Sequence, residues 1–333
     1  MKVKLMAPLA NVDDSIVGFE ITSEVLVTKY NVEKIIELLH PKKYVKPVEL
    51  GYLWDSALLD LKSDDIYVLE GTFKFPDINM GDSIAPSMEL LWDMHNRSEA
   101  IREKIYAISG EIREKMGLLD LFYDSQVDAP KHYFNTERGA HFTLNITTGE
   151  YRKIERRVAH IPSEHLPNVR KYLWEVSMGE KKEYLQIAFS YFRDSYLQED
   201  PRIVMLQLMM AVEAIFNMGE SDIAYIISRG MSVLLGDSID ESREIYRMMK
   251  KMYRARSGII HGGSASELDS AKIEHLRKYL KKCLRFLIHL DLKKETLYDG
   301  ITESGYGEYY KTAKDRFPYN LNDLGSADNA SGN

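Results

Sequence analysis

The chain has 333 residues, of which 44% are hydrophobic and 11% aromatic, and 44 basic against 51 acidic side chains give it a formal net charge of -7. This composition predicts a globular protein with two folded domains, and the acidic balance argues against a protein that coats nucleic acid through its overall charge. Neither a signal peptide nor an apolar run approaching the roughly 20 residues of a membrane span is present, so we expect a cytoplasmic protein without membrane contact.

The first half, residues 1–178, predicts a mixed α/β domain. Alternating apolar residues rich in Val, Ile, Tyr and Phe predict three strands, at about 2–6, 15–27 and 65–75. A long polar helix is expected from about 86 to 116, with Gly117 ending it, and a hairpin over 141–157 would turn near Thr148. No family resemblance indicates the role of this half. We expect it to bind a regulatory partner or trigger.

Catalytic motifs are absent from the first half. It has no Gly-rich phosphate loop, no HExxH and no nucleophile elbow. His160 and His165 are separated by Pro162, so they do not share a helix face and give only weak evidence for a metal site. The single cysteine, Cys283, excludes an intramolecular disulfide and a CxxC site, and we expect it to be a buried packing residue. We therefore expect neither metal nor cofactor.

Helical periodicity begins at about Lys181 and predicts an all-α bundle over 181–292, followed by a polar, flexible tail over 293–333. The fold class is therefore α+β. The segment 201–216 is apolar nearly all round, so it should be the central buried helix. Capping-box pairs, Ser238 with Glu241 and Ser264 with Glu267, are expected to open the last two helices.

Two clusters of cations stand out in this half. Residues 243–256 hold six basic residues and one acidic residue, and residues 277–285 hold five basic residues and none that is acidic. Two interpretations stay open for both clusters: solvated helix faces, or a surface that binds the phosphates of a polyanion.

The helix that Ser238 opens carries a charge on its apolar stripe. Five residues share this stripe at helical spacing: Ile245, Met249, Met252, Arg256 and Ile259. Arg256 therefore needs a carboxylate or a phosphate. Glu213, inside the apolar run LMMAVEAIF, needs a partner as well. We expect the two to pair, either as a purely structural ion pair or as one that orients Arg256 toward a phosphate.

A second stripe of the same helix holds Arg247, Lys251, Arg254 and His261. Gly262 and Gly263 follow and predict the end of the helix. Because a helix C-terminus favours cations and histidines, a structural role explains this stripe, but it does not explain Arg256.

These residues carry a family resemblance. The run LMMAVEAIF, followed some 35 to 45 residues later by YRARSGIIHG, resembles the HEPN superfamily, and within it the Apea-like HEPN domains, over about residues 181–292. Members share a helical bundle with an arginine, four to six intervening residues and a histidine. Arg256 precedes His261 with four intervening residues and Arg254 with six. The Glu-bearing apolar helix, the Tyr-x-x-Arg-Ser lead-in and the His-Gly helix end complete the match.

The resemblance implies a metal-independent endoribonuclease that acts on RNA as a homodimer, as a toxin or antiviral defence effector. His261 would be the general acid or base, and Arg256 would stabilise charge on the phosphoryl oxygens. The remaining candidates are supporting residues (Glu213, Tyr253, Ser257) and RNA-phosphate ligands (Arg254, Lys251, Arg247), with Arg254 as an alternative to Arg256. Ser257 departs from the Asn, Asp or His that many members carry, which leaves the activity open.

Two other interpretations remain. A HEPN-like bundle without catalysis would serve dimerisation or the binding of nucleotides or RNA. A helical scaffold would use Glu213 and Arg256 as a core pair and His261 as a cap. Dimer geometry separates these interpretations: catalysis requires His261 within reach of Arg256, in a solvent-accessible cleft beside Arg254. A His261 buried in the core of one subunit would favour the scaffold.

Overall fold

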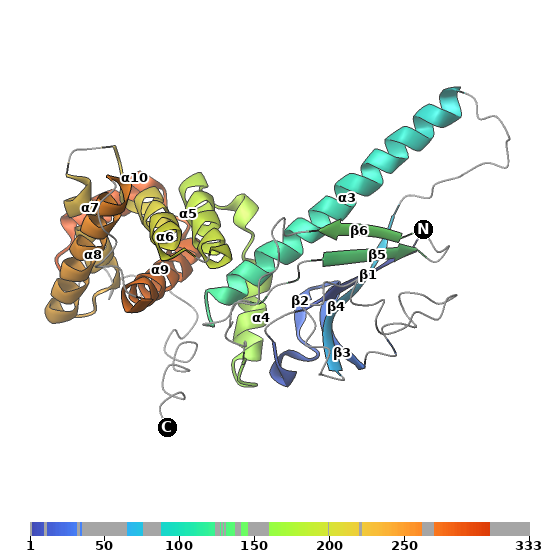
Figure 1. The fold of residues 1–333 in the computed structure, drawn as a ribbon, viewed down its shortest axis with the longest axis horizontal. Coiled ribbons are helices and arrows are strands. Elements are labelled where there is room, and N and C mark those ends of the chain that lie inside the picture. The colour runs from blue at the N-terminus through green and yellow to red at the C-terminus, as the bar shows by residue number, and fades with distance from the viewer. Residues whose placement is uncertain are drawn as a thin grey trace. The chain divides into compact units, whose positions relative to one another are not determined.

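The computed structural model describes residues 2–9, 12–31, 34, 65–75, 88–123, 127, 129, 131–136, 141–145, 160–198, 200–219, 222–261 and 270–306. Its contacts divide the chain into two compact units, Met1–Glu175 and Val176–Asn333. The first unit combines a sheet with helices and the second is helical, as Figure 1 shows, so the predicted α+β class is confirmed.

The first unit contains an antiparallel sheet of six described strands. They are β1 (Lys2–Pro8), β2 (Glu20–Thr22), β3 (Val25–Asn31), β4 (Asp65–Lys74), β5 (Lys131–Thr136) and β6 (His141–Asn145), in the order β2-β3-β4-β1-β5-β6. The inner strand β1 pairs with β4 and β5, so that Leu5 lies opposite both Gly71 and Phe134. Leu5, Met6 and Ala7 are fully buried, because an inner strand of a covered sheet places side chains of both faces in apolar surroundings.

Two predictions for this unit were wrong. The segment 15–27, expected as one strand, forms part of the 3-10 helix η1 (Asp14–Ile16) and then the hairpin of β2 and β3. Helix α3 (Met88–Asp120) does not end at Gly117. It continues because Leu118 and Leu119 are fully buried, and this burial outweighs the helix-breaking tendency of one glycine. The turn expected near Thr148 lies outside the described residues.

Helix α4 (Leu166–Glu175) completes the first unit and was not predicted. Val169, Tyr172 and Leu173 bury its apolar face. The buried Lys115 of α3 donates from its Nζ to the carbonyl of Leu173 at 2.6 Å, which satisfies one of the orphan acceptors at the end of α4.

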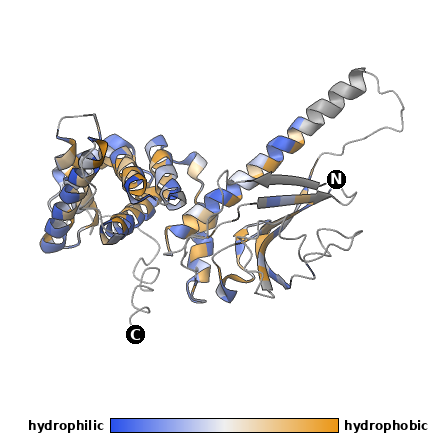
Figure 2. Ribbon diagram, in the orientation of Figure 1, coloured by the Kyte–Doolittle hydropathy of each residue, from blue (hydrophilic) through white to orange (hydrophobic). Residues whose placement is uncertain are grey.

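The second unit contains the helices α5 (Glu183–Asp194), α6 (Pro201–Phe216), α7 (Ile223–Leu235), α8 (Ile239–Ile260), α9 (Ser270–Leu290) and α10 (Lys294–Glu303), with the short 3-10 helices η2 (Met178–Glu180) and η3 (Ser195–Leu197). Helix α6 packs against α5, α7, α8 and α9, so it is the central helix that its apolar sequence predicted. Pro201 begins α6, and Asp200 caps it by accepting the N–H of Arg202 at 2.9 Å. Figure 2 shows the hydrophobic residues along α6.

The segment expected to be a flexible tail begins instead with helix α10. Leu297 and Ile301, four residues apart, are buried, and α10 packs against α6 and α7. Leu297 and Ile301 therefore form the apolar face with which this otherwise polar segment packs on α6 and α7. Residues 307–333 lie outside the described part.

Among the described residues, no helix is both long enough and apolar enough to cross a membrane. Cys283 is fully buried, as expected of a packing residue, and burial raises the pKa of its thiol.

Candidate functional site around Glu213 and Arg256

The site is built on α8, whose start and end are both defined by hydrogen bonds. Ser238 Oγ accepts the N–H of Glu241 at 3.2 Å, as the capping pattern predicted. The Glu241 carboxylate accepts the N–H of Asp237 at 3.0 Å, one residue before the position in an ideal capping box. At the other end, His261 is the C-cap residue and donates its backbone N–H to the carbonyl of Ser257 at 3.1 Å.

Arg256 lies on the core-facing stripe of α8, as the helical spacing predicted. Ile245, Met249 and Met252 of this stripe are at most 1% exposed. Arg256 follows one turn later and is only half-buried, with 25% of its side chain exposed. The apolar stripe therefore holds the base of the arginine in the core while the guanidinium reaches the surface.

Glu213 of α6 meets Arg256 and forms the predicted pair. Arg256 Nη2 lies 3.1 Å from Glu213 Oε1 and 3.2 Å from Oε2, and 19% of the Glu213 side chain is exposed. The Cζ atom of Arg256 also lies 5.7 Å from the centre of the Tyr253 ring, within the range of a cation–π interaction. Glu213 and Tyr253 therefore both contact the guanidinium.

The predicted second stripe of α8 lies on the surface. Arg247, Lys251, Arg254 and His261 are all exposed. His261 is five positions after Arg256, which in an α-helix corresponds to a rise of roughly 7.5 Å and a rotation of roughly 140°. The structure thus brings together Glu213, Tyr253 and Arg256, while His261 lies at the end of the same helix on the face of Arg254. Ser257 is half-buried and contributes its carbonyl to the helix end.

The basic cluster of 277–285 does not form a comparable surface. Lys281 and Arg285 are 7% and 6% exposed. Arg277 lies with its Cζ 4.5 Å from the centre of the Tyr196 ring and donates to Glu274 at 2.9 Å. For this cluster, the interpretation as a solvated helix face was therefore only partly correct, because three of its cations are engaged inside the fold, and phosphate binding stays a prediction. Lys278 and Lys282 are the exposed cations of this cluster, one turn apart, whereas α8 exposes three cations along one stripe.

Two exposed apolar residues beside the pair were missed from the sequence. Met210, one turn before Glu213, is 38% exposed, and Ile260, one turn after Arg256, is 50% exposed. Ile203, two turns before Met210 on the same face of α6, is 43% exposed. Because α6 is apolar nearly all round, its sequence pattern does not indicate which of its sides is exposed. These residues add exposed apolar surface next to Glu213 on α6 and next to Arg256 on α8.

The described residues contain no group of three or more His, Cys, Asp or Glu side chains that could hold a metal ion. His160 Nδ1 lies 2.9 Å from Asp13 Oδ2, and the Nδ1 of the buried His165 lies 3.5 Å from the hydroxyl of Tyr123. The two histidines therefore have separate partners within the first unit.

No protein-family model, no curated protein and no solved structure matches this chain. The functional proposal therefore depends on the contacts between α6 and α8.

Proposed function

We propose that the helical unit is a metal-independent endoribonuclease of the HEPN type, with Arg256 and His261 as its catalytic residues. The observation that carries the proposal is the partly exposed Arg256, which contacts Glu213. Both contacts with Glu213 are made by Nη2. Neither Nε nor Nη1 has a partner among the described residues, so both can donate to a phosphate. A guanidinium with one side fixed by a carboxylate is preorganised for a second anion.

The reaction follows from the two side chains. His261 removes the proton from a ribose 2'-hydroxyl, whose oxygen attacks the adjacent phosphorus, and the bond from phosphorus to the 5'-oxygen breaks. The departing 5'-oxygen takes up a proton from water, and His261 returns its proton to the solvent, so the products end in a 2',3'-cyclic phosphate and a 5'-hydroxyl. Arg256 stabilises the negative charge that builds on the phosphoryl oxygens. His261 is exposed and can therefore reach a bound RNA.

The exposed cations of α8 suit the backbone of the same RNA. Arg247, Lys251 and Arg254 lie one turn apart on the face that ends at His261. Gathering cations on one helix of an otherwise acidic chain creates a local attraction for phosphates that the net charge of -7 does not provide.

A homodimer is part of the proposal. Met210, one turn before Glu213 on α6, and Ile260, one turn after Arg256 on α8, expose apolar surface, and a second copy that covers them would also bring a second Arg256 and His261 to the same place. Because Arg256 and His261 diverge around α8 by roughly 140°, such a dimer offers one phosphate an arginine from one copy and a histidine from the other.

A HEPN-like module that binds RNA without cleaving it is the second candidate. The observation in its favour is that Arg256 and His261 lie roughly 140° apart around α8. One copy of the chain alone therefore does not place both side chains on one side of the helix, as cleavage within a single copy would require.

The deciding experiment incubates the purified full chain with 5'-labelled RNA in the presence of EDTA. We expect cleavage that leaves cyclic phosphate ends, and its loss in His261→Ala. His275→Ala, which removes an exposed histidine of α9, is the matched control and should cleave as the wild type does. RNA binding without cleavage by the wild type would establish the binding module. Equal cleavage by His261→Ala would remove this histidine from the mechanism.

A further inference from the structure

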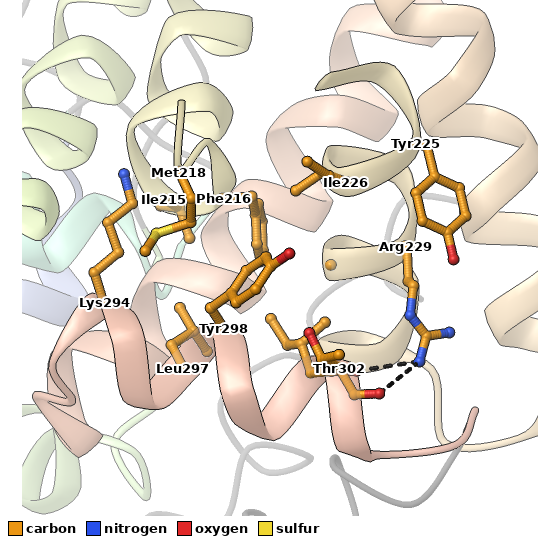
Figure 3. Close-up of a pocket in the computed structure, with 12 residues that line it drawn as sticks. Ile215, Phe216, Met218, Tyr225, Ile226, Arg229, Lys294, Leu297, Tyr298 and Thr302 are labelled. Carbon is orange, nitrogen blue, oxygen red and sulfur yellow. Dashed lines mark hydrogen bonds between the residues drawn. The ribbon is translucent and has the colours of Figure 1, made fainter. Parts of the chain in front are cut away.

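The second unit contains a cavity of about 120 Å³ between the end of α6, the first half of α7 and α10. Figure 3 shows the rings of Phe216 and Tyr298 in this cavity, with Ile226 and Leu297 beside them. Cavities of comparable size with apolar walls accommodate a molecule as large as benzene. The walls therefore suit one six-membered ring, and a whole nucleotide would be too large.

Two cations, Arg229 and Lys294, line this mostly apolar cavity. Arg229 Nη2 donates to the carbonyls of Ile301 and Ser304 at 3.2 and 3.0 Å. These acceptors belong to the C-terminal end of α10, where the helix dipole is negative. The charge of Arg229 therefore has a partner inside the fold.

Lys294 has one backbone acceptor among the described residues, the carbonyl of Asn217, which caps the C-terminal end of α6 and so also lies at the negative end of a helix dipole. Lys294 is the first residue of α10, where the helix dipole is positive, so the backbone disfavours a cation there. Its Nζ donates to the carbonyl of Asn217 at 2.6 Å and lies 6.0 Å from the centre of the Tyr184 ring, and no carboxylate of the described residues forms an ion pair with it. Burial lowers the pKa of Lys294. An ammonium group with unused N–H donors at the edge of an apolar cavity favours an anion.

We propose that this cavity binds a small aromatic carboxylate, with the ring between Phe216 and Tyr298 and the carboxylate on Lys294. The apolar walls supply affinity for the ring, and Lys294 supplies the preference for the anion over a neutral molecule of the same shape. The site is separate from the Arg256 and His261 site, and the proposal does not depend on RNA cleavage.

The test titrates the full chain with benzoate and with benzamide, its neutral counterpart of nearly equal shape, and measures binding by saturation-transfer NMR and calorimetry. We expect a Kd of about 1 mM or lower for benzoate, and binding of benzamide about tenfold weaker. Equal binding of the two compounds, or no binding of benzoate, would overturn the proposal.

Variants locate the binding. Lys294→Met should reduce benzoate affinity about tenfold to the level of benzamide. Lys293→Met, the matched control, removes the exposed lysine next to it and should leave the affinity unchanged. Ile226→Trp fills the cavity from α7 and should abolish binding of both compounds, with far-UV circular dichroism verifying the fold. A loss of affinity in Lys293→Met as large as in Lys294→Met would contradict the assignment.

Discussion

Glu213 and Arg256 are 43 residues apart in the sequence, and their side chains meet between α6 and α8 with Nη2 3.1 Å from Oε1. Each is the charged residue of an otherwise apolar stripe or run. Because both keep part of their surface in solvent, the pair is neither a sealed core ion pair nor an ordinary surface one. This intermediate burial suits an arginine that must stay in place and still meet a ligand.

The first prediction concerns the strength of this pair. Glu213→Gln keeps the shape of the side chain and removes its charge, so it leaves the half-buried Arg256 without a counterion. We expect a loss of about 1 to 2 kcal/mol in the free energy of unfolding, measured by urea denaturation. The double variant with Arg256→Gln should lose less than the sum of the two single variants, because the second change removes the stranded charge. Strict additivity would show that the two residues do not interact in solution.

The second prediction concerns the exposed cations of α8. Lys251→Gln and Arg254→Gln should each weaken RNA binding and reduce the slope of log K against log salt by about 1, because each removes one phosphate contact. Stability should change by less than about 0.5 kcal/mol, since both residues are exposed. Lys278→Gln and Lys282→Gln on α9 are the matched controls. An unchanged salt slope in the α8 variants would place the RNA elsewhere.

The sequence predicted α8 and its partner well for a physical reason. A charge on an apolar stripe is conspicuous, and burial requires a partner, so Glu213 and Arg256 could be matched without a structure. The helix start at Ser238 followed from local hydrogen bonding, which depends on residues within one turn.

Other features depend on packing that the sequence does not display. The turn at Ser23 and Glu24 between β2 and β3 lacks glycine, proline or asparagine, so alternation alone joined the two strands into one. The docking of α10 depends on two apolar residues, Leu297 and Ile301, and on a surface of α7 that exists only after folding. The exposure of Met210 likewise requires knowledge of which helices surround α6.

The third prediction is a pH dependence of the first unit. His132 of β5 is 1% exposed, its Nδ1 lies 2.8 Å from Ser109 Oγ, and burial lowers its pKa from 6.5 to about 4. Between about pH 6.5 and pH 4, His132 is protonated in the unfolded chain but not in the folded unit. The free energy of unfolding therefore falls as the pH falls through this window. A shift of this size corresponds to roughly 3 kcal/mol at the most.

Tryptophan fluorescence can follow this unfolding, because all three tryptophans, Trp54, Trp92 and Trp174, belong to the first unit. His132→Gln should flatten the decline in stability between pH 6.5 and pH 4. His160→Gln, which removes an exposed histidine of the same unit, should retain it. An equally steep decline in His132→Gln would assign the acid sensitivity to other groups.

The last prediction compares two glycines inside helices of the second unit. A Cβ atom at Gly230 of α7 would lie 2.5 Å from Cδ1 of Phe216, whereas a Cβ atom at Gly258 of α8 would meet nothing within 4 Å. The same substitution should therefore have opposite effects. Gly258→Ala should stabilise the unit by up to about 1 kcal/mol, because alanine loses less backbone entropy in a helix.

Gly230→Ala should destabilise the unit by about 1 to 3 kcal/mol, because the overpacking against the Phe216 ring outweighs the gain in helix propensity. Far-UV circular dichroism during urea unfolding measures both variants, since the second unit is helical. Adding Phe216→Leu to Gly230→Ala should recover part of the loss, because the smaller side chain makes room for the methyl group. If Gly230→Ala stabilised the protein as much as Gly258→Ala, the close contact of α7 with the end of α6 would be wrong.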